Sequence, residues 1–169
     1  KQGKWLLNVS TPTAGGPYEI TFNDGEALTL KNILIGEVWF CSGQSNMEMP
    51  MSGFDRQPTQ GTNDIIAKAK ASTPIRIYNT DSKDGRWVRQ YSKTPQEDCK
   101  GEWLENTPVN VSRTSAAAYF FARYIQEVLE VPVGIIVSSL GGSKVEAWMS
   151  REAITPFKSI DLAILDNDE

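Results

Sequence analysis

The 169-residue sequence contains no histidine, and this absence restricts the enzyme chemistry that the chain can perform alone. Histidine is the usual proton carrier near neutral pH, so a mechanism that needs an imidazole base is incomplete here. Two cysteines are too few for a disulfide framework or a closed structural zinc site. No apolar run approaches the roughly 20 residues that span a bilayer.

Basic residues are fewer than acidic ones: the chain has 17 Lys and Arg residues and 21 Asp and Glu residues, which gives a net charge of -4. Without a basic surplus the chain has no electrostatic footprint for nucleic acid or for an anionic membrane. Apolar residues make up 40% of the chain, which is enough to fill a core. The length predicts one domain, or one domain and part of another.

Residues 1–34 are expected to form β structure. Apolar and polar residues alternate from Tyr18 to Phe22, and Asn23-Asp24-Gly25 marks a tight turn before the alternation resumes. A single hairpin is only marginally stable in water, so it must pack on something else. We interpret it as the end of a β-domain that precedes a second domain over residues 35–169.

From residue 35 onward, short apolar runs alternate with helical periods, which predicts βαβ units and a parallel α/β sheet with helices on both faces. The expected strands are 37–41, which reads as buried on both faces, 75–78 and 134–138, and the expected helices are 63–71 and 115–130. Residues 81–110 show no clear period and are predicted to form a long surface excursion.

Two polar turns follow predicted parallel strands, Gly43 to Asn46 after the first and Gly141 to Ser143 after the third. The carboxyl ends of such strands meet at one edge of the sheet, where ligands bind. Ser45 is a candidate nucleophile there, although a serine that merely caps a turn fits the same pattern. The two glycines suit either an oxyanion-binding backbone or a plain turn. Lys144 could act as an amine base, but a solvated lysine is the simpler interpretation.

Two other sets of residues leave alternatives open. Several tryptophans could stack on a sugar ring or belong to the core, and Trp87 and Trp103 in the excursion are the better carbohydrate candidates. Cys41 reads as a small buried apolar residue, while a disulfide between Cys41 and Cys99 is the alternative.

The run from Ile35 to Glu48, IGEVWFCSGQSNME, closely resembles the first sequence block of the sialate O-acetylesterases, members of the SGNH (GDSL-like) hydrolase superfamily. Acetylxylan esterases of the same superfamily are close relatives of that family. Similar segments, in the family's order, are Gly15–Tyr18, Ala118–Ala122, Pro132–Ile136, Ser139–Ser143 and Val145–Met149. The resemblance therefore covers nearly the whole chain and implies an incomplete three-layer, flavodoxin-like SGNH-hydrolase domain.

The resemblance also implies a role for each site residue. Ser45 would be the nucleophile, and its N–H and that of Gly142 would form the oxyanion hole. The other pocket residues would be Gln44, Asn46, Gly141 and Ser143. The family pattern further needs an asparagine block and an Asp-x-x-His block, and neither is present in this sequence. We therefore expect the chain to be the N-terminal part of a longer catalytic domain, inactive without the missing C-terminal part.

The implied reaction is hydrolysis of O-acetyl esters of sialic acids, with no metal and no organic cofactor. An acetylxylan-type polysaccharide deacetylase and a non-catalytic carbohydrate-binding fragment are the alternatives. The expected partners are an O-acetylated sugar and the missing C-terminal part, not nucleic acid or a membrane. The family resemblance implies a secreted, periplasmic or lysosomal location.

Overall fold

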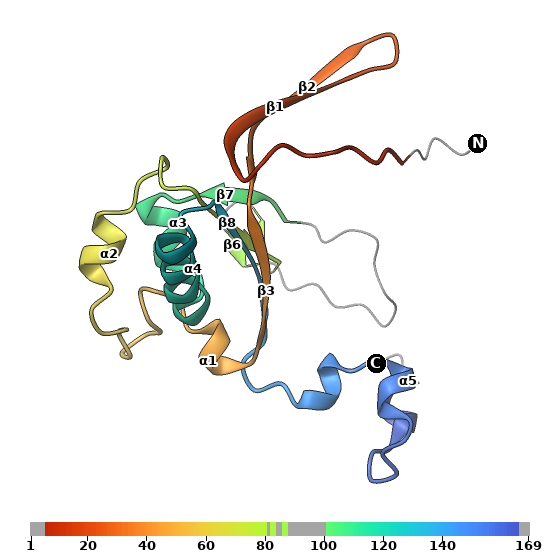
Figure 1. Cartoon of the computed structure of the whole chain (residues 1–169). Coiled ribbons are helices and arrows are strands. Elements are labelled where there is room, and N and C mark those ends of the chain that lie inside the picture. The colour runs from red at the N-terminus through yellow and green to blue at the C-terminus, as the bar shows by residue number, and fades with distance from the viewer. Residues whose placement is uncertain (1–5, 81, 84–85, 88–100, 166–169) are drawn as a thin grey trace.

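The computed structural model describes residues 6–80, 82–83, 86–87 and 101–165 (Figure 1). These residues form a hairpin, a four-stranded sheet, a short two-stranded ribbon and several helices. In chain order the elements are β1 (Gly15–Asn23), β2 (Ala27–Ile35), β3 (Glu37–Gly43), α1 (Ser45–Glu48), α2 (Asn63–Ala67), β4 (Ile75–Asn79), β5 (Ser82–Lys83), β6 (Arg86–Trp87), β7 (Trp103–Glu105), α3 (Pro108–Arg113), α4 (Ala116–Leu129), β8 (Val133–Ser139), η1 (Val145–Trp148), α5 (Arg151–Ile154) and η2 (Leu162–Leu165).

The β1–β2 hairpin is a sheet of its own and extends away from the other strands (Figure 1). The strands pair antiparallel, and the Gly25 N–H donates to Asn23 Oδ1 at 3.0 Å within the connecting turn. This side-chain acceptor is the feature that makes Asn favourable in a tight turn. The predicted hairpin is therefore confirmed, while the assignment of residues 1–34 to a separate β-domain stays a prediction.

Asn32 of β2 ties the hairpin to the four-stranded sheet. Its Oδ1 accepts from Arg76 Nη2 on β4 at 2.9 Å, and its Nδ2 donates to Glu105 Oε1 on β7 at 2.7 Å. The Arg76 side chain is only 14% exposed, so its charge needs these polar partners. Asn32 has a φ of 59°, a left-handed conformation that Asn tolerates better than most residues.

The four-stranded sheet has the order β3-β8-β4-β7. Strand β8 pairs parallel with β3 on one side and with β4 on the other, which confirms the predicted parallel arrangement. The prediction of a surface excursion over residues 81–110 was partly wrong. Strand β7 adds antiparallel to β4, and helix α3 follows it. Three residues are too few to show a strand period, so only the pairing with β4 reveals β7.

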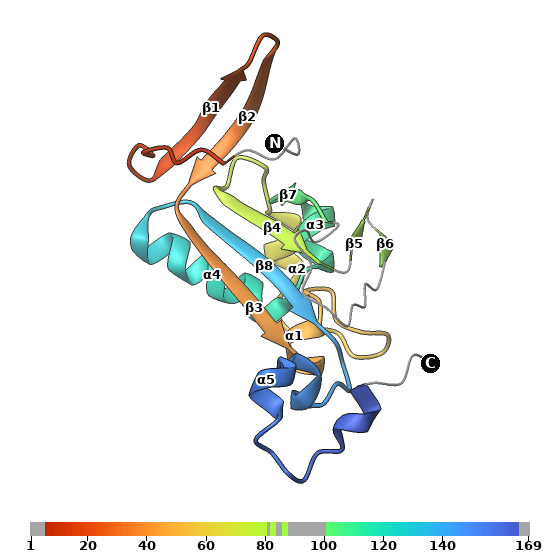
Figure 2. The same ribbon diagram turned by 90° about the vertical axis from the view of Figure 1, so that its right-hand side faces the viewer.

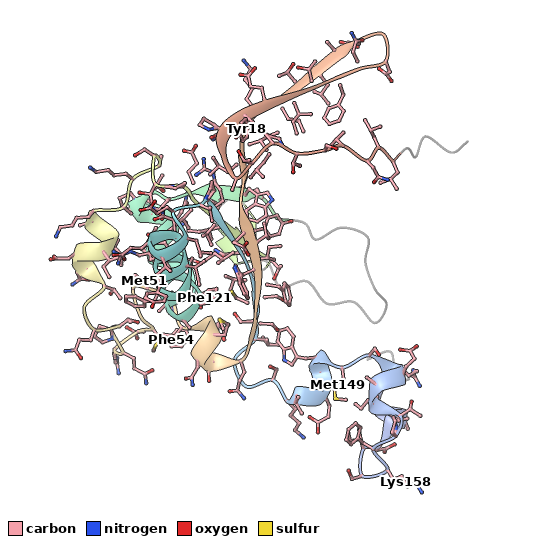
Figure 3. The ribbon with its side chains drawn as sticks, in the orientation of Figure 1. Tyr18, Met51, Phe54, Phe121, Met149 and Lys158 are labelled. Carbon is pink, nitrogen blue, oxygen red and sulfur yellow. The ribbon has the colours of Figure 1, made fainter. Side chains whose placement is uncertain are left out.

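One face of the sheet forms the core, and helix α4 covers it (Figures 1 and 2). Its fully buried strand residues are Ile75, Ile77, Val133 and Ile135, and α4 adds Ala118, Tyr119 and Ala122. Because alternate residues of a strand point to opposite faces, the pairing of Ile77 with Ile135 brings large side chains together in one layer. Met51, in the loop after α1, fills the same core at 0% exposed (Figure 3).

Helix α4 begins and ends where its sequence predicts. The Ser115 hydroxyl caps it by accepting the Ala118 N–H at 3.2 Å, and the left-handed Glu130 (φ 54°) ends it before Pro132. Helix α2 is shorter than the predicted 63–71 and ends at Ala67. The Ala69 N–H donates to Ile66 O at 3.1 Å, a tighter turn than the α-helix allows.

Strand β3 lies at the edge of the sheet, so the prediction that it is buried on both faces was wrong. Val38 and Phe40 are 61% and 65% exposed on the face opposite α4. On the covered face, Trp39 packs edge-on against Phe121 of α4, with ring centroids 5.1 Å apart. An apolar run indicates a strand suited to burial, but the run itself does not say whether neighbouring elements cover both faces.

The helices that pack on the sheet most extensively, α1 and α4, lie on the same face (Figure 1). The described residues therefore supply two layers of the expected three-layer α/β arrangement. None of the helices in the described part of the chain combines the length and the apolar character needed to cross a bilayer.

Truncation of Ile135 tests the assignment of the core face. Ile135 is 0% exposed, so Ile135→Ala should lower the free energy of unfolding by about 2–5 kcal/mol. Its neighbour Ile136 points to the other, more open face, and Ile136→Ala should cost clearly less. Urea denaturation followed by circular dichroism compares the two variants, and equal losses would contradict the one-sided core.

Candidate functional site

The parallel pairing of β3 with β8 brings the two polar turns together at one edge of the sheet. Gly43 pairs with Ser139 at the last position of both strands, and the Leu140 N–H donates to Gly43 O at 3.0 Å. Figure 2 shows both strands ending beside α1. The two turns predicted to be neighbours are therefore adjacent, although they lie about a hundred residues apart in the sequence.

The first turn places Ser45 at the start of helix α1. The Met47 and Glu48 N–H groups both donate to Gln44 O at 2.9 Å, which closes the turn. The Ser45 side chain is exposed, and its Oγ donates to Gln44 Oε1 at 3.0 Å. The hydroxyl is thus accessible and oriented, as a nucleophile requires, but its partner is an amide oxygen and not a base.

The second turn holds Gly141, Gly142 and Ser143. Ser143 closes it twice, through its N–H at 3.2 Å and its Oγ at 2.6 Å from Leu140 O. Gly142 has a φ of 78°, which glycine adopts at no steric cost, and a Cβ built there would meet no heavy atom within 4 Å. Open space therefore lies beside the Gly142 backbone, and its N–H has no acceptor among the described residues.

Side chains of the first turn reach the second one. Gln44 Nε2 donates to Ser143 O at 3.4 Å, and the Gly141 N–H donates to Glu48 Oε2 at 2.6 Å. The structure therefore brings together five of the predicted site residues, Gln44, Ser45, Gly141, Gly142 and Ser143. Asn46, the sixth, is exposed, and its side chain forms no hydrogen bond within the described part of the chain.

Sequence reasoning missed Glu48 as a residue of this cluster, and it ranked Trp148, one of the tryptophans considered for sugar stacking, below Trp87 and Trp103. Glu48 lies three residues after Ser45, a helical spacing that places both on one side of α1 and could have drawn attention to it. Trp148 Nε1 donates to Ser143 Oγ at 2.9 Å, and its side chain is 40% exposed. It lies closer to the candidate site than Trp103, which packs against Tyr78 on the sheet. For Trp87, only the β6 backbone is described.

Lys144 and Cys41 behave as the simpler interpretations predicted. Lys144 is exposed at the start of η1, so nothing buries its amine as a lysine base would require. Cys41 is 9% exposed in the core, and burial raises the pKa of its thiol. Cys41 is a free cysteine in the structure, which argues against the alternative of a disulfide with Cys99, a residue outside the described part of the chain.

These parts suit acyl transfer. An exposed serine hydroxyl can attack a carbonyl carbon, and an N–H group without an acceptor among the described residues, such as that of Gly142 in the adjacent turn, can hold the oxygen that becomes negative. A parallel α/β sheet with such a serine and a glycine turn at its carboxyl edge fits the class of α/β serine esterases. The chain belongs to the sialic acid-specific acetylesterase family of carbohydrate esterases, whose family model matches residues 35–160.

Individual relatives agree with this family. The chain is 26% identical over 160 residues to the sialate O-acetylesterase of Mus musculus, covering 89% of this chain and 28% of that protein. With the sialate O-acetylesterase of Homo sapiens it shares 27% identity over 160 residues, covering 89% and 29%. The crystal structure of a carbohydrate acetylesterase from Xanthomonas citri superposes with a TM-score of 0.72 at 32% identity, covering 86% of this chain and 31% of that one. The chain thus spans less than a third of the length of these relatives.

Thiol reactivity tests the environment of Cys41. A raised pKa leaves less thiolate at a given pH, so in a Cys99→Ser variant the folded thiol should react with Ellman's reagent at pH 8 more slowly than after unfolding in urea. A Cys41→Ser variant measures Cys99 alone and serves as the control. Rapid reaction of Cys41 in the folded chain would show that the thiol is accessible.

Proposed function

We propose that this chain carries the serine nucleophile of a carbohydrate O-acetylesterase that removes O-acetyl groups from sialic acids. The observation that carries the proposal is the contact between the Ser45 turn and the Gly141-Gly142 turn, in a chain that belongs to an acetylesterase family. In this proposal the contact would bring a nucleophile and backbone donors to one tetrahedral centre.

The proposed reaction has two stages. Ser45 Oγ bonds to the acetyl carbonyl carbon, and the carbonyl oxygen becomes an oxyanion held by the Ser45 and Gly142 N–H groups. The bond to the sugar oxygen then breaks, the serine proton passes through a base to that oxygen, and an acetyl-enzyme remains. Water attacks the acetyl-enzyme in turn, which releases acetate and restores the Ser45 hydroxyl.

The proton carrier of this reaction must come from outside the 169 residues. The sequence has no histidine, and the Ser45 hydroxyl donates to the Gln44 amide oxygen. We propose that the C-terminal part of the catalytic domain, which lies outside these 169 residues, supplies the histidine, its aspartate and the asparagine donor. The relatives' greater length supports this, since the chain covers 28% of the mouse enzyme.

The C-terminal part would pair with the edge strand β3. Its outer edge has unpaired backbone groups in the described sheet, and Val38 and Phe40 are 61% and 65% exposed beside it. Parallel strands are normally covered on both faces, so an exposed apolar edge strand favours a further strand and a further layer there. Such an addition would extend the sheet next to the Ser45 turn, where a base is needed.

The choice of sugar is the finer part of the proposal. Sialic acid is favoured because the curated relatives are sialate O-acetylesterases. A broader carbohydrate substrate is the second candidate, since the relative from Xanthomonas citri is described as a carbohydrate acetylesterase and shares 32% identity. The proposed location is secreted, periplasmic or lysosomal.

Activity of the chain with and without its missing part tests the proposal. Loss of one triad member typically removes on the order of 10⁴ to 10⁶ in rate, so the 169-residue chain alone should release no measurable acetate. Fusion to the C-terminal part of the catalytic domain should restore acetate release from an O-acetylated sialic acid. Acetylated xylan in the same assay distinguishes the second candidate.

The Ser45→Ala variant of the fusion decides the role of the nucleophile, and it should be as inactive as the chain alone. Ser112→Ala is the matched control, since Ser112 lies on α3 and its hydroxyl bonds only Val109 O, at 2.8 Å, in the described structure. Activity that survives Ser45→Ala would overturn the proposed nucleophile. A fusion inactive on both substrates that still binds sugar would favour the non-catalytic carbohydrate-binding alternative.

A further inference from the structure

Glu48 connects the two turns of the candidate site. Its Oε2 accepts the Gly141 N–H at 2.6 Å, the shortest of the hydrogen bonds described between the turns. The donor and the acceptor are separated by 93 positions in the sequence. A bond to a carboxylate is shorter and about twice as strong as a bond between neutral groups. Glu48 is half-buried, so water competes only partly for this contact.

The glycine at position 141 is what lets the carboxylate approach. A Cβ built on Gly141 would overlap Glu48 Oε2 and would also lie 3.7 Å from the Ser45 Cα. Any larger residue would therefore have to displace the Glu48 carboxylate, whereas its contact with the Ser45 Cα would be an ordinary van der Waals one. The close approach joins the Gly141 backbone to the helix that carries Ser45.

This bond also determines which N–H groups remain for a substrate. The Gly141 N–H is occupied by Glu48, whereas the Gly142 N–H has no acceptor among the described residues. Glu48 thus holds the Gly141 peptide in place, and the next peptide is left free to bind an oxyanion. The serine hydroxyl donates to Gln44 Oε1, so Glu48 is not the partner of the nucleophile.

From these contacts we infer that Glu48 is a positioning residue, which fixes the glycine turn relative to Ser45 and so sets the geometry of the oxyanion hole. The inference rests on the proposed function for its catalytic consequence, but the hydrogen bond itself can be tested without activity. Because Ser45 and Glu48 belong to the same four-residue helix, movement of α1 would shift the nucleophile and the oxyanion donor together.

Amide hydrogen exchange of the 169-residue chain, measured by NMR, tests the bond directly. The Gly141 amide should be protected in the native sequence, and Glu48→Ala should accelerate its exchange roughly ten- to hundredfold. Glu48→Gln keeps an acceptor oxygen and should retain most of the protection. Glu127→Ala, which removes an exposed carboxylate on α4, is the matched control and should leave Gly141 unchanged.

The native spectrum keeps this test decisive even if Glu48→Ala does not fold. An unprotected Gly141 amide in the native chain, or protection that Glu48→Ala leaves intact, would overturn the inference.

Kinetics of the fusion with the C-terminal part test the catalytic consequence. A displaced oxyanion donor weakens binding of the transition state more than binding of the substrate, so Glu48→Ala should lower kcat about 10²-fold with little change in KM. Glu48→Gln should recover most of that loss, which a merely destabilising substitution would not permit. An unchanged kcat in Glu48→Ala would overturn the positioning role.

Failure of the proposed function and failure of the positioning role of Glu48 give different results. If Ser45→Ala leaves the activity intact, the proposed nucleophile is wrong, and the exchange of Gly141 still decides whether Glu48 holds the glycine turn.

Discussion

The parallel pairing of β3 with β8 is the constraint on which the rest of the structure depends. Seven consecutive residue pairs, from Glu37 with Val133 to Gly43 with Ser139, hold the two strands in one register. A shift of one residue would turn Ile135 and Cys41 away from the core and would also separate the turns that follow. The packing of α4 and the contact between Ser45 and the glycines therefore depend on the same set of hydrogen bonds.

Within the described residues, one face of the sheet is covered by helices and the other face is exposed at β3. On the face that helix α4 covers, Ile77 of β4 and Ile135 of β8 are completely buried. On the opposite face, Val38 and Phe40 of β3 are exposed. This asymmetry agrees with a chain that spans under a third of its relatives' length. The apolar residues of β3 are suited to a layer that the described residues do not provide, which is why we propose β3 as the surface for the rest of a catalytic domain.

The candidate site is divided in the same way. The groups proposed to act by position lie within this chain. They are the Ser45 hydroxyl, the Gly142 N–H, which has no acceptor among the described residues, and the Glu48 carboxylate, which accepts the Gly141 N–H. The sequence contains no histidine, so the proposal assigns the proton carrier to residues outside this chain. Backbone donors need only a rigid turn, which the β3–β8 pair provides locally, whereas the base that we propose for Ser45 would have to come from an additional element.

The sequence by itself determined the hairpin, the three parallel strands, helix α4 and the two turns, because each depends on a local period, cap or turn residue. Its resemblance to the acetylesterases also singled out Ser45 and Gly142. Only the tertiary structure decided that β3 is an edge strand, that β7 pairs with β4, and that Glu48 reaches Gly141. These features join residues distant in the chain, and no local pattern records which distant groups will meet when the strands pair.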